Sequence, residues 1–153
     1  MNIEENYDKV FRYCYYRLQN RQIAEDITQE TFLRFLNSGY KEQHKEIRYL
    51  YTIARNLCID EARKPKASEL PPDYEYSDGG SGAADLDNHL FMKDILAKLT
   101  EEDRALLVLR YVNEEPFSVI CKELQVSRFS LYRKLKCVTQ KLKILTEGGN
   151  SNE

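Results

Sequence analysis

The chain has 153 residues, of which 42% are apolar and 31% charged, with six glycines and four prolines. This composition supports a folded core and excludes collagen-like, proline-rich and intrinsically disordered classes. No apolar run approaches the roughly 20 residues of a membrane-spanning helix, and no N-terminal stretch resembles a signal peptide. We therefore expect a soluble, cytoplasmic protein without membrane insertion. Helical spacing of apolar residues dominates over β-type alternation, which favours an all-α fold.

Charge divides the chain into segments. Residues 1–64 carry 11 basic and 10 acidic groups, residues 65–88 carry 1 and 6, and residues 89–153 carry 11 and 9. The middle segment is rich in Pro, Gly and Ser and repels itself, which predicts a flexible acidic linker. We expect two small helical domains, at 1–64 and 89–147, joined by the linker at 65–88 and followed by a disordered tail at 148–153.

Three helices are expected in the first domain, at 3–19, 21–37 and 46–64, because apolar residues recur there at helical spacing. Their predicted core positions are Ile3, Tyr7, Val10, Phe11, Cys14 and Leu18; Ile23, Ala24, Ile27, Thr31 and Phe35; and Ile47, Leu50, Ile53, Ala54, Leu57 and Cys58.

Two polar helix faces in this domain are candidate binding surfaces. Opposite Ile27, the second helix collects Asp26, Gln29, Glu30 and Leu33, which is either a solvated acidic face or a docking surface for a basic partner. The third helix places an amide, hydroxyl, arginines and an aromatic on one side, a pattern suited to a nucleic-acid backbone and unstacked bases unless it is ordinary surface. Its members are Arg48, Tyr49, Thr52, Arg55, Asn56 and Arg63.

The second domain is expected to hold a helix-turn-helix. A helix that opens near Asn88 presents Leu90, Phe91, Ile95 and Leu99 on one side. Thr100 then caps a helix that stops near Asn113. Pro116 starts a short helix that ends at Leu124, and Ser127 caps a long helix at 128–146.

The last helix combines a narrow apolar seam with a basic surface. Its seam is Leu131, Leu135, Val138, Leu142 and Leu145, and its cations are Arg128, Arg133, Lys134, Lys136, Lys141 and Lys143. No acid appears before Glu147, and such a helix repels itself unless a polyanion neutralises it. The first turns, with Ser130 and Tyr132 beside the cations, are where a recognition helix meets base edges.

Neither a metal centre nor an enzyme active site is expected. Cys14, Cys58, Cys121 and Cys137 form no close pair, only two histidines are present, and the cysteines are predicted to pack in or near apolar faces. There is no paired-acid site and no glycine-rich phosphate loop. We therefore predict a non-enzymatic protein without a cofactor.

Two strings resemble region 2 of bacterial sigma factors: AEDITQETFLR at residues 24–34 and YLYTIARNLCIDEARK at residues 49–64. Residues 106–145 resemble region 4, the helix-turn-helix of these proteins. The order and length of the matches are similar to those of the small extracytoplasmic-function (ECF) group of the sigma-70 family. The resemblance implies a sigma factor that binds core RNA polymerase and promoter DNA and promotes promoter opening.

The resemblance also implies a role for each candidate face, and an anti-sigma factor as a further partner. The segment expected to bind the β′ clamp coiled coil of core polymerase contains Asp26, Gln29, Glu30, Phe32 and Leu33. The residues expected to bind the −10 element and to hold a flipped base of the non-template strand are Arg48, Tyr49, Thr52, Arg55, Asn56 and Arg63. The residues expected to bind the −35 element are Arg128, Ser130, Tyr132, Arg133, Lys134 and Lys136. They belong to the domain that is also expected to contact the β flap of core polymerase.

The chain departs from the family pattern at several positions. Tyr49 stands where Trp is usual, Val119 and Cys121 replace an acid and an alanine, and Gln125 replaces the turn glycine. A left-handed Gln125 costs on the order of 1 kcal/mol relative to glycine. Two other interpretations remain open: a helix-turn-helix transcription regulator that is not a sigma subunit, and a protein-only adaptor.

Overall fold

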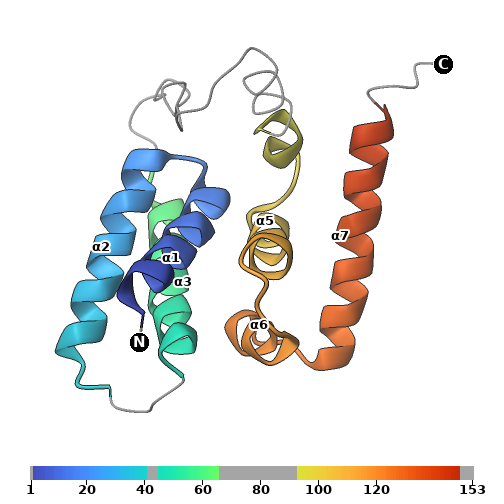
Figure 1. The fold of residues 1–153 in the computed structure, drawn as a ribbon. Coiled ribbons are helices and arrows are strands. Elements are labelled where there is room, and N and C mark those ends of the chain that lie inside the picture. The colour runs from blue at the N-terminus through green and yellow to red at the C-terminus, as the bar shows by residue number, and fades with distance from the viewer. Residues whose placement is uncertain (1, 41–44, 66–92, 149–153) are drawn as a thin grey trace.

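The computed structural model describes residues 2–40, 45–65 and 93–148, and the elements in these ranges are helices (Figure 1). This agrees with the expected all-α class. The predicted linker apart from Pro65, the predicted tail apart from Gly148, and the start of the helix expected near Asn88 lie outside the described residues.

The N-terminal bundle consists of α1 (Ile3–Leu18), α2 (Arg21–Asn37) and α3 (Glu46–Arg63), which pack pairwise against one another. Asn2 and Asn20 cap the first two helices, accepting bonds from the N–H groups of Glu5 and Ile23 at 3.0 and 2.9 Å. Gln19 is left-handed, with φ 54°, and lets α1 turn sharply into α2. The observed bounds match the predicted helices to within one residue.

Most predicted core residues of this bundle are buried, including Val10, Cys14, Ala54 and Cys58. Ile3 was wrongly assigned to the core, since it is 57% exposed at the first turn of α1. The core also contains side chains that the apolar stripes did not include. These are Tyr13, Arg17, Thr28, Phe32 and Tyr51.

The C-terminal bundle contains a helical stretch at 93–97 followed by α5 (Glu101–Leu107), η1 (Val108–Val112), α6 (Phe117–Leu124) and α7 (Arg128–Gly148). Thr100 caps α5 as expected, since its hydroxyl accepts from the Asp103 N–H at 3.1 Å. The predicted single helix up to Asn113 instead ends in a π-helical turn, in which Asn113 N–H bonds to Val108 C=O at 2.7 Å.

The helix-turn-helix is formed by α6, a tight turn and α7. Gln125 ends α6 in the left-handed region, with φ 58° and ψ 47°. Ser127 accepts from the Ser130 N–H at 3.1 Å and so opens α7. The apolar seam of α7 lies against α5 and α6, with Leu131 and Val138 fully buried. Cys137 was wrongly expected to pack, because it is exposed on the other side of α7.

The two bundles pack against each other, an arrangement that the sequence did not predict. α1 lies against α5 and η1, and α3 lies against α6, while α7 stands on the far side of the C-terminal bundle (Figure 1). Buried residues of both bundles form one connected cluster. Sequence reasoning expected two tethered domains, and the structure shows them in contact.

Candidate nucleic-acid and polymerase interfaces

The polar face of α2 presents an exposed leucine pair ringed by charge. Leu33 is 57% exposed and Leu36, which was not among the predicted residues, is 64% exposed. Asp26, Gln29 and Glu30 are also exposed, and Glu30 accepts from Arg34 Nε at 2.8 Å. The spacing of Leu36, three residues after Leu33, is the signal that could have identified it.

Phe32 does not belong to this exposed surface. It is 9% exposed and its ring lies 5.5 Å from that of Tyr7 on α1. Together with Thr28, Thr31 and Phe35 it widens the buried stripe of α2, and its contact with core polymerase stays a prediction.

The candidate −10 face of α3 contains both open and covered side chains. Thr52, Asn56 and Arg63 are exposed, whereas Arg48 is half-buried. The Thr52 hydroxyl donates a hydrogen bond to the Arg48 carbonyl at 3.0 Å and is therefore engaged within its own helix.

Tyr49 lies in a cluster of three aromatic rings. Its ring stacks on Tyr40 with centroids 4.7 Å apart and planes 23° apart, and Phe35 lies 5.9 Å away beneath it. Tyr40 also contacts Phe35 at 5.8 Å. Tyr40 therefore occupies one ring face of Tyr49, as an unstacked base does when a protein holds it on an aromatic side chain.

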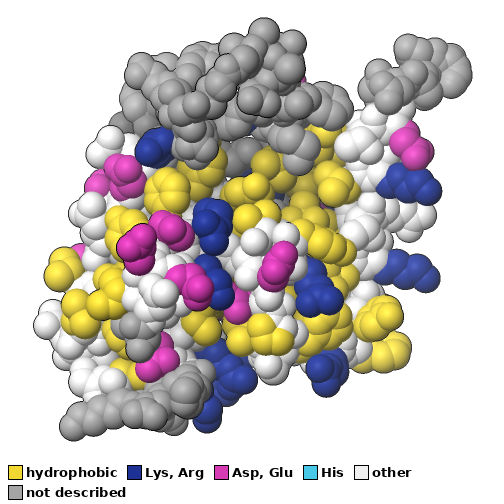
Figure 2. Space-filling view, viewed as in Figure 1, with side chains coloured by type: hydrophobic (Ala, Val, Ile, Leu, Met, Phe, Trp, Pro, Cys, Tyr) yellow, Lys and Arg dark blue, Asp and Glu magenta, His cyan; other side chains and the backbone are white. Residues whose placement is uncertain are grey.

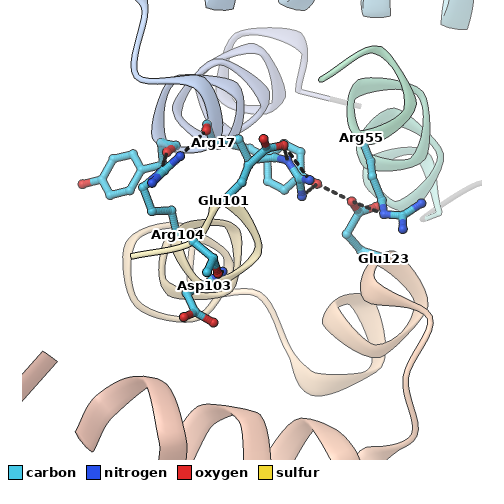
Figure 3. A network of polar contacts seen from close by, with 9 residues as sticks. Arg17, Arg55, Glu101, Asp103, Arg104 and Glu123 are labelled. Atoms are coloured by element: carbon cyan, nitrogen blue, oxygen red, sulfur yellow. Dashed lines mark hydrogen bonds and ion pairs between the residues drawn. The ribbon is translucent and has the colours of Figure 1, made fainter. Parts of the chain in front are cut away.

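Arg55 is the residue of this face that contacts the other bundle. Its side chain is 24% exposed, and its Nε lies 4.0 Å from Glu123 Oε2 on α6. Figure 3 shows Arg55 turned toward Glu123 across the boundary between α3 and α6. In this conformation α6 covers that end of the α3 face.

The candidate −35 face of α7 is open to solvent. Arg128, Arg133, Lys134 and Lys136 are exposed, and within the described ranges no ion pair involves them. Lysines and arginines project along the α7 edge of the molecule in Figure 2. Lys141, farther along, is paired with Asp103 of α5 at 3.1 Å.

Aromatic rings accompany the cations at the start of α7. Phe129 is 72% exposed, and the Arg133 guanidinium lies 5.3 Å from its ring centroid. Tyr132 is 67% exposed and meets Phe117 of α6 edge-on at 6.3 Å. Ser130 is half-buried beside the capping Ser127. The pattern of cations alone does not identify Phe129, although an aromatic residue one helical turn before Arg133 is itself a signal.

Polar side chains join the two bundles in a buried network (Figure 3). Arg17 Nε and Nη2 of α1 contact Glu101 Oε1 at 3.0 and 2.9 Å. Arg104 of α5 donates to the carbonyls of Tyr16 and Arg17 at 2.7 and 2.8 Å. These carbonyls end α1 and have no partner within the helix, so Arg104 acts as a cap supplied by the other bundle.

Carboxylates of the C-terminal bundle meet tyrosines of the N-terminal one. Tyr51 of α3 donates its hydroxyl to Glu115 at 2.6 Å, and Lys9 Nζ lies 3.3 Å from the same carboxylate. Burial, together with the adjacent Glu115 charge and this hydrogen bond, raises the pKa of Tyr51. Tyr13 of α1 donates to Glu123 of α6.

Glu123 is the least satisfied member of the network. Its side chain is 1% exposed, and its Oε1 has no hydrogen-bond partner among the described residues. Burial raises the pKa of the Glu123 carboxyl to about 8, against the opposing influence of the Tyr13 hydrogen bond and of Arg55 and Arg17.

The described residues contain no group of three or more side chains that could hold a metal ion. Nor does any helix among them combine the length and apolarity needed to cross a membrane.

Comparison with known proteins gives matches that agree with the all-α fold and the helix-turn-helix described above. Residues 3–68 match the family model for sigma-70 region 2. The ECF RNA polymerase sigma factor SigW of Bacillus subtilis is 31% identical over 70% of this chain and 66% of its own length. SigM of the same organism is 26% identical over the full length of both chains. SigL of Mycobacterium tuberculosis H37Rv is 25% identical over 92% of this chain and 84% of its own.

The chain belongs to the sigma-70 family, in the extracytoplasmic-function group of RNA polymerase sigma factors.

Proposed function

We propose that this chain binds core RNA polymerase through α2, engages the opened −10 element through α3 and recognises the −35 element through α7. Residues 2–65 then act as region 2 and residues 93–148 as region 4. One observation supports the proposal above the others. The same chain has an exposed leucine pair, Leu33 and Leu36, on α2 and a cationic second helix, α7, in its helix-turn-helix.

The α2 surface distinguishes a sigma subunit from a helix-turn-helix regulator that acts alone. Leu33 and Leu36 form an exposed apolar centre, and Asp26 and Glu30 give its edge negative charge. An apolar centre with a charged rim is the usual build of a protein interface. A basic helical hairpin of the polymerase clamp is the partner that this surface fits.

On α3, Tyr49 and the exposed amide of Asn56 supply stacking and hydrogen bonding for an extruded base. Opening a duplex costs a few kcal/mol for each unstacked base, so a site that holds the extruded base favours the open form. Arg63 and Arg55 are the proposed contacts to phosphates along the same strand, since arginine is a common ligand of the DNA backbone.

On α7, Arg128 and Arg133 are the candidate base contacts, since bidentate arginine–guanine pairs are the commonest specific contact in the major groove. Phe129 joins them as an apolar contact for a thymine methyl group, and its ring also orients Arg133. Lys134 and Lys136 are further candidate contacts to the −35 element, and Lys143, farther along the helix, is assigned to phosphates or solvent.

Asp26→Lys should weaken binding to core polymerase while the bundle stays folded, because Asp26 is exposed and the substitution adds repulsion against a basic coiled coil. The test is retention of core enzyme in a pull-down together with promoter-specific transcription by purified core polymerase. Glu102→Lys, at an exposed position of α5, is the control of equal charge. Equal retention by both variants would remove α2 from the interface, and specific DNA binding without any transcription would favour the regulator.

A further inference from the structure

Phe129 has the most exposed large apolar side chain in the part of the molecule that the structure describes. It is 72% exposed, ahead of Tyr132 at 67% and Leu36 at 64%. It lies in the first turn of α7, about 200° of helical rotation from the fully buried seam residue Leu131. The ring therefore faces away from the surface that attaches α7 to its bundle and adds little to the core.

Arg133 and Phe129 form a paired unit on this outer side of α7. The two residues are four apart, which is about one helical turn, and the Arg133 guanidinium lies over the Phe129 ring at 5.3 Å from its centroid. Arg133 is itself exposed. A cation–π contact of this kind restricts a long side chain before any ligand arrives. The start of α7 thus presents one planar cation and one apolar ring in a fixed relation.

The other aromatic contacts in this region have a different purpose. Tyr132 meets Phe117 of α6 edge-on at 6.3 Å, and the guanidinium groups of Arg110 and Arg128 lie 4.9 and 5.7 Å from the centre of the Phe117 ring. Phe117 is half-buried, so these contacts join α6 to α7 across the turn. Phe129 is outside this cluster and its ring is open to a partner.

In the major groove of DNA the two members of the pair would meet neighbouring base pairs. An arginine that recognises guanine lies alongside O6 and N7 of that base. Successive bases are about 3.4 Å apart along a strand, so a ring stacked on this arginine lies at the level of the next base pair. The apolar group in the groove at that level is the C5-methyl group of thymine. Against other bases the ring would cover polar groups without replacing their hydrogen bonds, which is unfavourable.

We propose that Phe129 and Arg133 together recognise a 5-methylpyrimidine in the base pair next to a guanine, and that 5-methylcytosine is accepted in place of thymine. This inference rests on the proposed function of α7. Thymine and 5-methylcytosine carry the same methyl group at C5 and differ at position 4, where one has an oxygen and the other an amino group. A phenyl ring has no hydrogen-bonding group with which to distinguish them. Cytosine methylation beside a guanine therefore strengthens binding of this chain to DNA.

The first experiment identifies the sequence that α7 recognises. The full chain selects duplexes at one salt concentration from two random libraries, one with ordinary cytosine and one with 5-methylcytosine at every cytosine. We expect the ordinary library to yield a guanine with a thymine in the neighbouring base pair. In the methylated library, 5-methylcytosine should appear at the thymine position as often as thymine itself.

The second experiment measures binding to duplexes of the selected sequence that differ only at this pyrimidine. Wild type should bind the 5-methylcytosine duplex about fourfold more tightly than the cytosine duplex, as expected for burial of one methyl group. Its affinity for the thymine duplex should lie within about twofold of that for 5-methylcytosine. Phe129→Ala should lose the preference for methylated over ordinary cytosine. Ile144→Ala, which removes a 63% exposed apolar side chain farther along α7, is the matched control and should keep it.

The outcomes distinguish this inference from the function on which it rests. If wild type selects a defined sequence but binds methylated and ordinary cytosine equally, the inference is wrong while α7 remains the −35 reader. If Phe129→Ala keeps the fourfold preference, another residue contacts the methyl group and the assignment to Phe129 is wrong. If the full chain selects no sequence from either library, the proposed function of α7 fails and the inference fails with it.

Discussion

The two candidate DNA faces, on α3 and on α7, differ in what occupies them. On α7, Arg133 and Lys134 extend into solvent with no described acid paired to them. On α3, Arg55 lies beside Glu123 of the other bundle, and Tyr49 is stacked against Tyr40. The candidate face on α7 is open to solvent, whereas the one on α3 is partly occupied by groups from the same chain.

This difference shows that the residue types on a helix face and the exposure of that face to solvent are determined by different features of the chain. The type of face follows from helical periodicity, which both helices share. Its availability depends on tertiary partners, and α7 uses its apolar seam to attach to α5 and α6 while its cations face away. α3 is covered on both sides, by its own bundle and by α6, so part of its charged surface lies inside the molecule.

The largest expected effect is a pH dependence of the free energy of unfolding, and it originates at Glu123, beside the covered face of α3. Glu123 has an ordinary pKa of 4.5 and a pKa of about 8 when buried. Between these values the folded form binds more protons than the unfolded form, so the free energy of unfolding falls as pH rises. We expect a loss of about 2 kcal/mol between pH 6 and pH 8 in the free energy of unfolding, measured with denaturant at each pH.

Glu123→Gln tests the origin of that loss because it keeps the shape of the side chain and removes the titration. In the variant the free energy of unfolding should change much less between pH 6 and pH 8. The reason is that the side chain facing Tyr13, Arg17 and Arg55 then stays neutral at every pH. An equally steep profile in the variant would assign the pH dependence to other groups. Binding of α7 to duplex DNA at fixed pH should be the same in both proteins.

The second prediction concerns the open face. Arg133→Ala should reduce affinity for a matched −35 duplex by roughly 1–3 kcal/mol and reduce it less for a scrambled duplex, because a base contact discriminates and a phosphate contact does not. Both duplexes must be compared at one salt concentration, since the electrostatic part of binding changes steeply with salt. Equal losses on both would mean that Arg133 grips DNA without recognising its sequence.

The fold and the open face could largely be predicted from the sequence. Regular apolar spacing placed α1, α2 and α3, and the caps Thr100 and Ser127 marked where α5 and α7 begin. These are local signals, in which a residue and its neighbours within one or two turns determine the outcome. The cations of α7 belong to the same class.

The contact between the bundles could not be predicted in this way. Tyr13 and Glu123 are 110 residues apart in the chain, and Tyr51 and Glu115 are 64 apart. Each is polar or amphipathic and lies beside an apolar stripe, so periodicity alone assigns it to solvent. Arg17 is likewise buried, and its ionic partner Glu101 comes from the other bundle. Such burial depends on long-range pairing, for which one sequence carries no local signal.

A smaller effect is expected at Phe129, which sharpens the description of the open face. Replacing thymine by deoxyuracil in the −35 duplex removes only the methyl group with which the ring is proposed to pack. Wild type should lose about 1 kcal/mol of binding on that duplex, whereas Phe129→Ala should show almost no difference between thymine and uracil. If both proteins lose the same amount, the methyl group contacts another residue and Phe129 serves to orient Arg133.

The smallest effect is expected at the far end of α7, where Lys143 and Lys141 differ in their contacts. Lys143 is exposed, while Lys141 is paired with Asp103 at 3.1 Å and so contributes to the attachment of α7 to α5. Lys143→Ala should weaken matched and scrambled duplexes equally, lower the salt dependence of binding by about one counterion and leave stability within about 0.5 kcal/mol. Lys141→Ala should cost up to about 1 kcal/mol of stability, as expected for a partly exposed pair. A sequence-dependent loss for Lys143→Ala would extend the recognition surface along the whole of α7, and the contrast between a base-contacting start and a phosphate-contacting end of this helix would then be wrong.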